Sequence, residues 1–178
     1  MPYQQLQQLK RLLQRFWFFS PERLWHASIA LTRRGHWMLA FWLKHVNGFI
    51  YHNSLSPGAT VGRGVWLGHN GLGVVVNPNV EIGDNVLIWH NVTLSAGRPE
   101  VRGGPREGPG VSRIVVEDDV VIGAGAILFA PRGATMRIGR GARIGAGTVV
   151  TGDVPPRATV VGPQARVLHA EETAAESG

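Results

Sequence analysis

Aliphatic residues recur at every sixth position through most of the chain, from Leu55 to Val154. A period of six matches neither the 3.6-residue repeat of an α-helix nor the two-residue alternation of a half-buried strand. A fixed short period is typical of a solenoid, in which short strands meet at corners and each leading residue points toward the axis. The leading residues are Leu55, Val61, Leu67, Val76, Ile82, Ile88, Leu94, Val116, Ile122, Leu128, Ile138, Ile144 and Val150.

The six-residue spacing breaks in three places, and each break predicts residues that lie outside the regular coils. Three extra residues occur around 69–71, a long stretch occurs at 95–112, and four extra residues occur within 130–135. Long polar segments on a rigid scaffold frequently carry function, so 95–112 is expected to be a protruding loop. The solenoid is therefore predicted to occupy residues 51–168, with a short acidic tail at 169–178.

Residues 1–50 have a different pattern, which predicts a small helical cap in front of the solenoid. Apolar residues at three- and four-residue spacing predict an amphipathic helix over 3–19. The sequence Ser-Pro-Glu at 20–22 is a favourable helix start, and this second helix should run to about Arg34. A third, nearly all-apolar helix is predicted from 36 to about 46, ending at the Asn-Gly pair that follows.

The cap has two interpretations. In the first, it closes the open end of the solenoid and packs against sister subunits. In the second, its basic, tryptophan-rich surface lies on an anionic membrane. Residues 1–50 carry seven basic side chains and one acidic one, so the cap holds the whole net charge of +6. No nucleic-acid-binding motif accompanies this charge, and a nucleic-acid partner is not predicted.

Composition narrows the remaining possibilities. A chain of 178 residues is expected to form one domain with a small appendage. The absence of cysteine excludes disulfides, thiolate metal ligands and a cysteine-linked acyl intermediate. No apolar run is long enough to span a membrane, and the first residues are too rich in glutamine for a secretory signal. We therefore expect a cytoplasmic protein, with the inner face of the cell membrane as a peripheral contact.

Two of the seven histidines are candidates for chemistry. His69 lies in an insertion that interrupts the repeat, beside glycines that leave space for a ligand. His90 occupies an ordinary repeat position, from which it can line the same cleft on the next coil or simply stack there. Imidazole exchanges protons near neutral pH, which suits a general base acting on a hydroxyl group.

Several segments resemble serine O-acetyltransferase and its relatives, a branch of the bacterial hexapeptide-repeat family, over about residues 49–168. They are SPGATVGRGVWLGHNGLGVVV, GDNVLIWHNVTLSAG, VVIGAGAI, GRGARIGAGTVV and DVPPRATVVG. The resemblance implies a left-handed parallel β-helix, a homotrimer and acetyl-CoA as co-substrate. It also implies that His69 is the general base, which takes a proton from the acceptor hydroxyl while that oxygen attacks the thioester directly. The tetrahedral oxyanion would then need a donor such as a glycine-rich backbone N–H.

The resemblance further implies a CoA groove between neighbouring coils of two subunits. Small residues along the groove let the pantetheine lie against the backbone, and arginines are candidates for its phosphates, with a solvated surface as their ordinary alternative. These residues are Gly125, Ala126, Ala146, Arg140, Arg143 and Arg157. In the predicted loop, Arg98 and Arg106 are candidates for binding an anionic acceptor such as a sugar nucleotide.

Four positions depart from the resemblance. Ser54 stands where the family has an aspartate fifteen residues before the histidine, and Gly68 stands where an acid directly precedes it. An Arg-His pair of the family's loop aligns with Gly110 and Val111. The expected acceptor is therefore a sugar hydroxyl, for example of a surface polysaccharide, and serine is the alternative. The candidates for orienting His69 are Ser54, Asn70, His90 and a main-chain carbonyl.

Two hypotheses from other classes are weighed against acetyl transfer. A zinc enzyme like the γ-type carbonic anhydrases needs three histidines, whereas His69 and His90 lack a third nearby in the sequence. No metal is therefore predicted. The other hypothesis is a non-catalytic scaffold whose cap or loop binds another protein.

Overall fold

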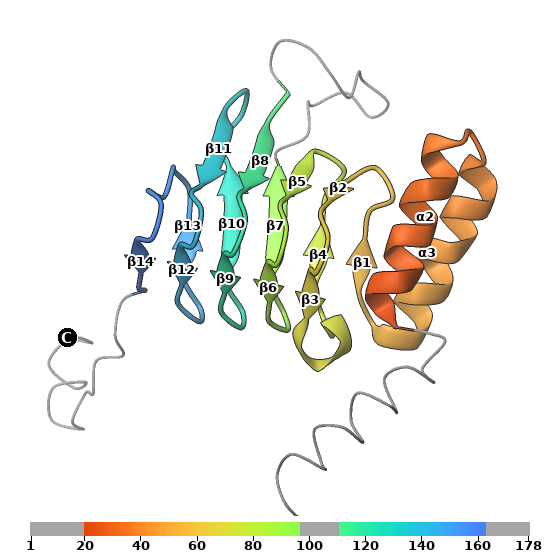
Figure 1. Ribbon diagram of the computed structural model, residues 1–178, viewed down its shortest axis with the longest axis horizontal. Coiled ribbons are helices and arrows are strands. Elements are labelled where there is room, and N and C mark those ends of the chain that lie inside the picture. Colours follow the sequence, from red (N-terminus) through yellow and green to blue (C-terminus); the bar gives the residue numbers. More distant parts are fainter. Residues whose placement is uncertain (1–19, 97–110, 163–178) are drawn as a thin grey trace, which may run out of the picture.

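The computed structural model describes residues 20–96 and 111–162 (Figure 1). Within these ranges, two α-helices precede a stack of short strands, all paired in parallel. The predicted helix at 3–19, most of the predicted loop and the tail at 169–178 lie outside the described residues.

The strands form three parallel sheets, and the chain visits them in turn. Sheet A contains β1 (Ser54–Leu55), β4 (Val75–Val76), β7 (Thr93–Ala96), β10 (Ile127–Ala130) and β13 (Val149–Val150). Sheet B contains β2 (Thr60–Val61), β5 (Val80–Ile82), β8 (Arg113–Val116) and β11 (Thr135–Ile138). Sheet C contains β3 (Trp66–Leu67), β6 (Leu87–Ile88), β9 (Val121–Ile122), β12 (Arg143–Ile144) and β14 (Thr159–Val160). This is the predicted left-handed parallel β-helix.

The repeat residues form the core of this prism, as the six-residue period predicts. Leaders of successive coils lie in register, with Leu55 beside Val76 and Leu67 beside Ile88. Almost every leader is buried, and Val61 on the first coil is half-buried. Each fully buried aliphatic side chain contributes about 1.5–3 kcal/mol relative to an exposed one, so the stacked columns are the main source of stability.

All three predicted insertions lie at corners between sheets. The first forms a short 3-10 turn, η1 (Gly68–Gly71), between sheets C and A. The other two both lie between sheets A and B, on adjacent coils. Ser112 joins them, because its hydroxyl donates to the Pro131 carbonyl (2.8 Å) and accepts from the Gly133 N–H (3.0 Å). Extra residues thus leave the strands undisturbed.

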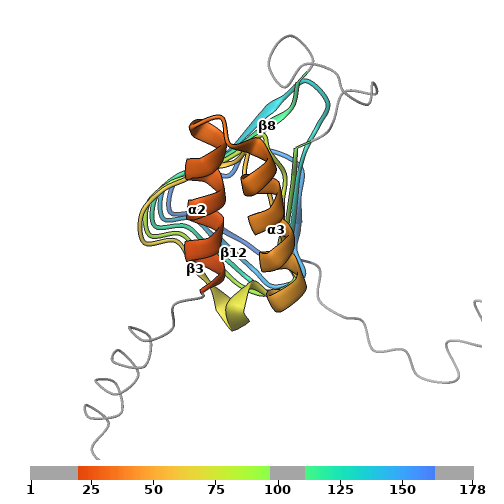
Figure 2. The same ribbon diagram turned by 90° about the vertical axis from the view of Figure 1, so that its right-hand side faces the viewer.

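Helix α2 (Pro21–Arg33) begins and ends where the sequence predicts, with the Ser20 hydroxyl accepting from the Arg23 N–H at 3.2 Å. It lies with α3 across the first coil, as Figure 2 shows with both helices in front of the stacked strands. Trp25 is 1% exposed, and its indole N–H donates to the Ser56 carbonyl at 2.8 Å. The helices therefore cover the open end of the prism.

Helix α3 (Trp37–Tyr51) corrects the prediction that a helix ends near residue 46 at the Asn-Gly pair. Asn47 is buried inside the helix, where its amide donates to the Pro21 carbonyl (2.9 Å) and accepts from Asn53 Nδ2 (3.3 Å). A Cβ on Gly48 would lie 2.9 Å from the Asn53 carbonyl oxygen. The pair therefore allows close packing within the helix, which ends instead at His52 in a left-handed conformation.

Glu22 connects the helices to the first coil, and its replacement by alanine is expected to destabilise the protein by about 1–2 kcal/mol. Its carboxylate accepts from the partly buried Leu67 N–H at 2.9 Å, and alanine leaves that donor without a partner. Thermal unfolding followed by circular dichroism measures the effect. Glu81→Ala is the matched control, because it removes only the exposed ion pair to Arg113 and should cost less than about 0.5 kcal/mol.

Candidate active site

The corner between sheets C and A brings the predicted histidines and the small residues of the predicted CoA groove to one edge of the prism. Backbone hydrogen bonds of 2.8–3.0 Å connect this corner from coil to coil. They run from Gly73 to His52, from Asn91 to Leu72, from Gly125 to His90 and from Gly147 to Ala124. His69, His90, Gly125 and Ala146 therefore lie on successive coils of the same corner.

His69 lies on the 3-10 turn with a left-handed backbone, at φ 52° and ψ 41°, and Asn70 follows at φ 58°. Left-handed conformations are uncommon for non-glycine residues and cost roughly 1–3 kcal/mol each, so they are often found at functional sites. The turn holds the imidazole outside the regular coil, where it is exposed. An exposed imidazole on a constrained backbone can meet a substrate without a large rearrangement.

His90 lies one coil further along, with its ring 4.8 Å from that of His69 and nearly perpendicular to it. The Nδ1 atom of His90 is buried and has no hydrogen-bond partner. Buried polar atoms are nearly always paired, so this unpaired atom beside an exposed imidazole makes His90 a candidate site residue. Five glycine N–H groups of this corner are used in coil-to-coil hydrogen bonds, namely those of Gly73, Gly123, Gly125, Gly145 and Gly147. These five are therefore not free to stabilise an oxyanion.

Trp89 belongs to the site, although the sequence analysis did not include it. Its ring lies 5.8 Å from that of His69 and packs edge-on against Trp66. A Cβ on Gly68 would lie 2.9 Å from the Trp89 ring. Position 68 therefore has no room for a side chain, because the Trp89 indole fills that space. The sequence places Trp89 directly after the leader Ile88, but the contact with Gly68 depends on the pairing of Ile88 with Leu67, which only the structure shows.

Ser54 begins β1 and lines a hollow of about 440 Å³ between α3 and sheet A, together with Trp37, Phe41 and Lys44. Among the residues that the structure describes, neither Ser54 nor Asn70 forms a side-chain hydrogen bond to His69. His90 is the predicted orienting residue that the structure places against His69.

The outer surface of the C–A corner is open beside the small residues. A Cβ on Gly147 would meet no atom within 4 Å, and one on Gly125 would meet only the Gly147 nitrogen, at 4.0 Å. Ala146 is exposed, whereas the side chain of Ala126 is fully buried in the core. A narrow chain such as pantetheine could lie along Gly125 and Ala146, and Ala126 would support it from beneath.

Two of the three predicted phosphate-binding arginines lie at another corner. Arg140 and Arg157 stack at the corner between sheets B and C, joined by a backbone hydrogen bond of 2.9 Å, whereas Arg143 lies on β12, the strand that leads into the C–A corner. Arg140 forms an ion pair of 2.8 Å with Asp118. At the same corner the Arg63 backbone N–H holds the pKa of Asp84 below its usual range. Arg98 and Arg106 lie outside the described residues.

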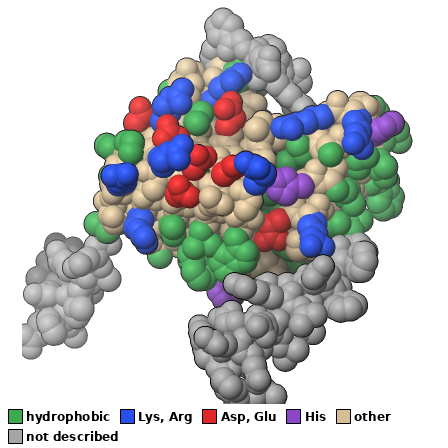
Figure 3. All heavy atoms as spheres, viewed as in Figure 1, with side chains coloured by type: hydrophobic (Ala, Val, Ile, Leu, Met, Phe, Trp, Pro, Cys, Tyr) green, Lys and Arg blue, Asp and Glu red, His purple; other side chains and the backbone are tan. Residues whose placement is uncertain are grey.

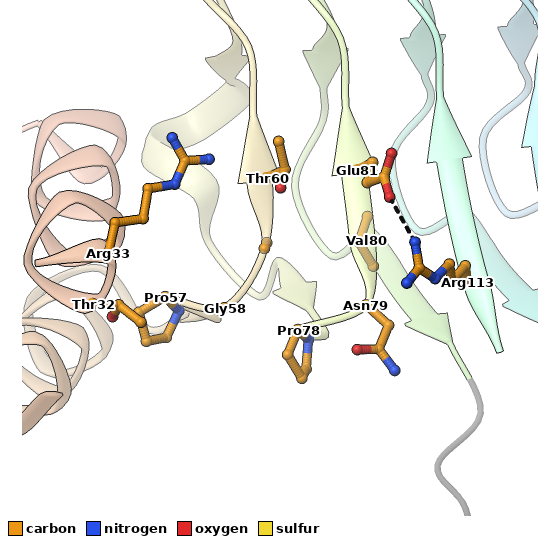
Figure 4. A pocket seen from close by; sticks show the side chains of 11 residues that line it. Thr32, Arg33, Pro57, Gly58, Thr60, Pro78, Asn79, Val80, Glu81 and Arg113 are labelled. Atoms are coloured by element: carbon orange, nitrogen blue, oxygen red, sulfur yellow. Dashed lines mark hydrogen bonds and ion pairs between the residues drawn. The ribbon is translucent and has the colours of Figure 1, made fainter. Parts of the chain in front are cut away.

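A second hollow, of about 300 Å³, lies between the end of α2 and the first coils, at the corner between sheets A and B. Figure 4 shows Arg33 on one side and the ion pair of Glu81 with Arg113 on the other. No histidine lines it. Across the described ranges, no three His, Cys, Asp or Glu side chains are grouped closely enough to hold a metal ion.

Comparisons with known proteins show the family of the chain. The family model for the bacterial transferase hexapeptide (six repeats) matches residues 58–96. A serine acetyltransferase of Helicobacter pylori is 36% identical over 139 residues, which cover 78% of this chain and 74% of that protein. The chain belongs to the serine acetyltransferase family.

Other members of the family are similar over a smaller part of their length. Serine acetyltransferase of Bacillus subtilis is 37% identical over 139 residues, which are 78% of this chain and 58% of that protein. The crystal structure of Neisseria gonorrhoeae serine acetyltransferase in complex with serine superimposes with a TM-score of 0.66 and 32% identity, covering 84% of this chain and 57% of that one. This chain thus spans less than two thirds of several serine acetyltransferases that it matches.

Proposed function

We propose that the protein is an acetyl-CoA-dependent O-acetyltransferase with L-serine as its acceptor. The observation that carries the proposal is the exposed His69 imidazole on a left-handed turn, beside an open corner lined by small residues. His69 removes the proton from the acceptor hydroxyl, and the oxygen attacks the thioester carbonyl of acetyl-CoA. The tetrahedral intermediate then collapses, the carbon–sulfur bond breaks, and the CoA thiolate takes the proton from the imidazolium.

His90 acts on His69 in this proposal. Its ring meets the His69 ring edge to face at 4.8 Å, which restricts the directions that the base can adopt. Its buried, unpaired Nδ1 gives the site a polar group that a bound substrate or water can reach after a small rearrangement. His90 is therefore assigned a positioning role, whereas His69 touches the reacting hydroxyl.

The acceptor follows from the relatives rather than from the departures in the sequence. The similar proteins are named serine acetyltransferases, and one of the similar structures is a complex with serine. The sugar hydroxyl that the sequence analysis favoured has no support among these comparisons. One reason for favouring it was that Gly68 replaces an acid of the family. The Trp89 ring, however, fills the space that a side chain at position 68 would need. Serine, the alternative of the sequence analysis, is therefore the acceptor that we propose.

The proposal includes a homotrimer in which a neighbouring subunit completes the CoA groove. Large apolar side chains are exposed on both sides of the C–A corner, and such surfaces favour association. They are Trp66 on sheet C and Ile127, Phe129 and Val149 on sheet A. Because acetyl-CoA is a metabolite of the cell interior, the proposed location is the cytoplasm.

A thiol-release assay tests the proposed function. Purified protein, acetyl-CoA and L-serine are expected to release CoA at least ~10-fold faster than protein and acetyl-CoA alone, as expected for a catalysed transfer. The protein has no cysteine, so a thiol reagent reports CoA without background. Release with hexoses and not with serine would replace the acceptor but keep acetyl transfer. No release with any hydroxyl compound would contradict the proposed function itself.

A further inference from the structure

Helix α3 leaves most of its large apolar side chains exposed. Its buried residues are Ala40, Asn47 and Tyr51, and Leu43 and Val46 are half-buried. The exposed residues include seven large hydrophobic side chains, with Trp42 68% and Phe49 84% exposed. The whole set, here called the α3 face, is Trp37, Met38, Leu39, Phe41, Trp42, Phe49 and Ile50. So large a group of exposed apolar side chains marks a contact surface.

The charges near the α3 face are basic. Arg33 and Arg34 lie at the turn before α3, and Lys44 is the one Lys, Arg, Asp or Glu residue within the helix. Glu22 is the single acidic residue of positions 1–50, and its carboxylate is bonded to the Leu67 N–H on the far side of α2. The α3 face is thus an apolar surface with a basic border and no neighbouring acid in the cap sequence.

The position of α3 makes this surface accessible to a flat partner. Figure 2 shows both helices in front of the coils, so the end of the prism and not one of its sides carries the α3 face. In Figure 3 hydrophobic side chains gather at the helical end of the molecule, with Lys, Arg and His side chains along the border. No helix among the described residues is long and apolar enough to cross a bilayer.

We propose that the α3 face docks the protein on an anionic lipid surface, with the helix lying in the plane of the interface. Exposed tryptophans and apolar side chains insert among the acyl chains, and a basic border attracts anionic headgroups. A second copy of the chain fits less well, because an isologous contact would bring the basic borders of two copies together. Residues 1–19 would add Lys10, Arg11 and Arg15 without an acid, so they do not complement the border either.

Vesicle flotation tests the proposal on the full chain. The probes are vesicles of phosphatidylcholine alone and of phosphatidylcholine with roughly one third phosphatidylglycerol. The bound fraction is expected to be at least ~10-fold larger on the anionic vesicles at low salt and to fall as salt screens the charges. No flotation with anionic vesicles, or equal flotation with both kinds, overturns the proposal.

Variants locate the contact. The double variant Trp42→Ser/Phe49→Ser should lower the bound fraction at least ~10-fold, and Arg34→Gln about 5-fold, because one cationic side chain near an anionic surface has an effect of this size. Arg137→Gln is the matched control for Arg34→Gln, since Arg137 is exposed on β11, at the end of sheet B away from the helices, and it should bind like the parent protein. Circular dichroism verifies folding, and thiol release in the same samples is expected to be unchanged.

Two results contradict docking through the α3 face. In one, the double variant floats as well as the parent protein. In the other, the parent protein fails to float, and the double variant sediments without lipid as a smaller assembly than the parent. That result would make the α3 face an interface between copies of the chain. Both measurements are independent of the acceptor, so a failure of the proposed acetyl transfer would leave the lipid result interpretable.

Discussion

Replacing His69 by asparagine is expected to lower thiol release from acetyl-CoA at least ~100-fold, as for loss of a general base. Asparagine removes the imidazole but tolerates the left-handed backbone that His69 adopts at φ 52°. Alanine would remove the same group and also introduce backbone strain, so asparagine separates chemistry from folding. Initial rates with saturating acetyl-CoA and serine measure the effect, and circular dichroism confirms that the variant is folded.

The control for this prediction is His45→Ala. His45 is also an exposed histidine, but it lies on α3, where its ring contacts Phe41 and not the C–A corner. Its replacement should change the rate less than ~2-fold, since it touches no reacting group. A His69→Asn variant that releases thiol at the parent rate would remove His69 from the mechanism.

His90→Gln should lower the maximal rate more than it changes the KM for acetyl-CoA, as expected for a positioning residue.

Replacing Gly123 by alanine should destabilise the protein by about 3 kcal/mol, the upper range for overpacking. Gly123 lies at the C–A corner, where its N–H donates to the Ile144 carbonyl of the next coil at 2.8 Å. An added Cβ would lie 2.6 Å from the Ala146 nitrogen and 2.8 Å from the Gly145 carbonyl carbon. Both atoms are backbone, so relief requires the coils to separate and their hydrogen bonds to lengthen.

Thermal unfolding measures this effect, and a fall in Tm of roughly 6–12 °C is expected for a chain of this size. Gly152→Ala is the matched control, because a Cβ there meets no atom within 4 Å and the backbone is not left-handed. Its stability should change by less than about 0.5 kcal/mol. Equal Tm values for the two variants would show that the spacing between coils adapts to a methyl group.

The sequence by itself determined the solenoid and the exposed histidine at its first break. Stacked coils repeat the same contacts, so a period of six residues is enough to identify the inward positions, and Leu94, Ile122 and Leu128 are buried as expected. An insertion in such a stack can only leave it at a corner. For this reason the break around 69–71 located the exposed histidine without knowledge of the fold's details.

The tertiary structure decided which residues from different coils meet. The three inserted residues set Leu67 in register with Ile88, and this register brings Trp89 over Gly68 and His90 beside His69. A sequence period describes one coil at a time, whereas these contacts depend on how two coils align. The alignment of coils also brings Arg140 to Asp118, with which it forms an ion pair at a corner away from the histidines.

The helices show the same division. Local signals gave the start of α2, because a serine cap and a proline act within one helical turn. They failed at the end of α3, where hydrogen bonds to Pro21 and from Asn53 hold Asn47 in the helix. Pro21 is distant in the sequence, and Asn53 lies beyond the expected end of the helix. The pattern of apolar residues in α3 also did not reveal which side packs. Only the contacts with α2 and the first coil showed that the tryptophans face outward.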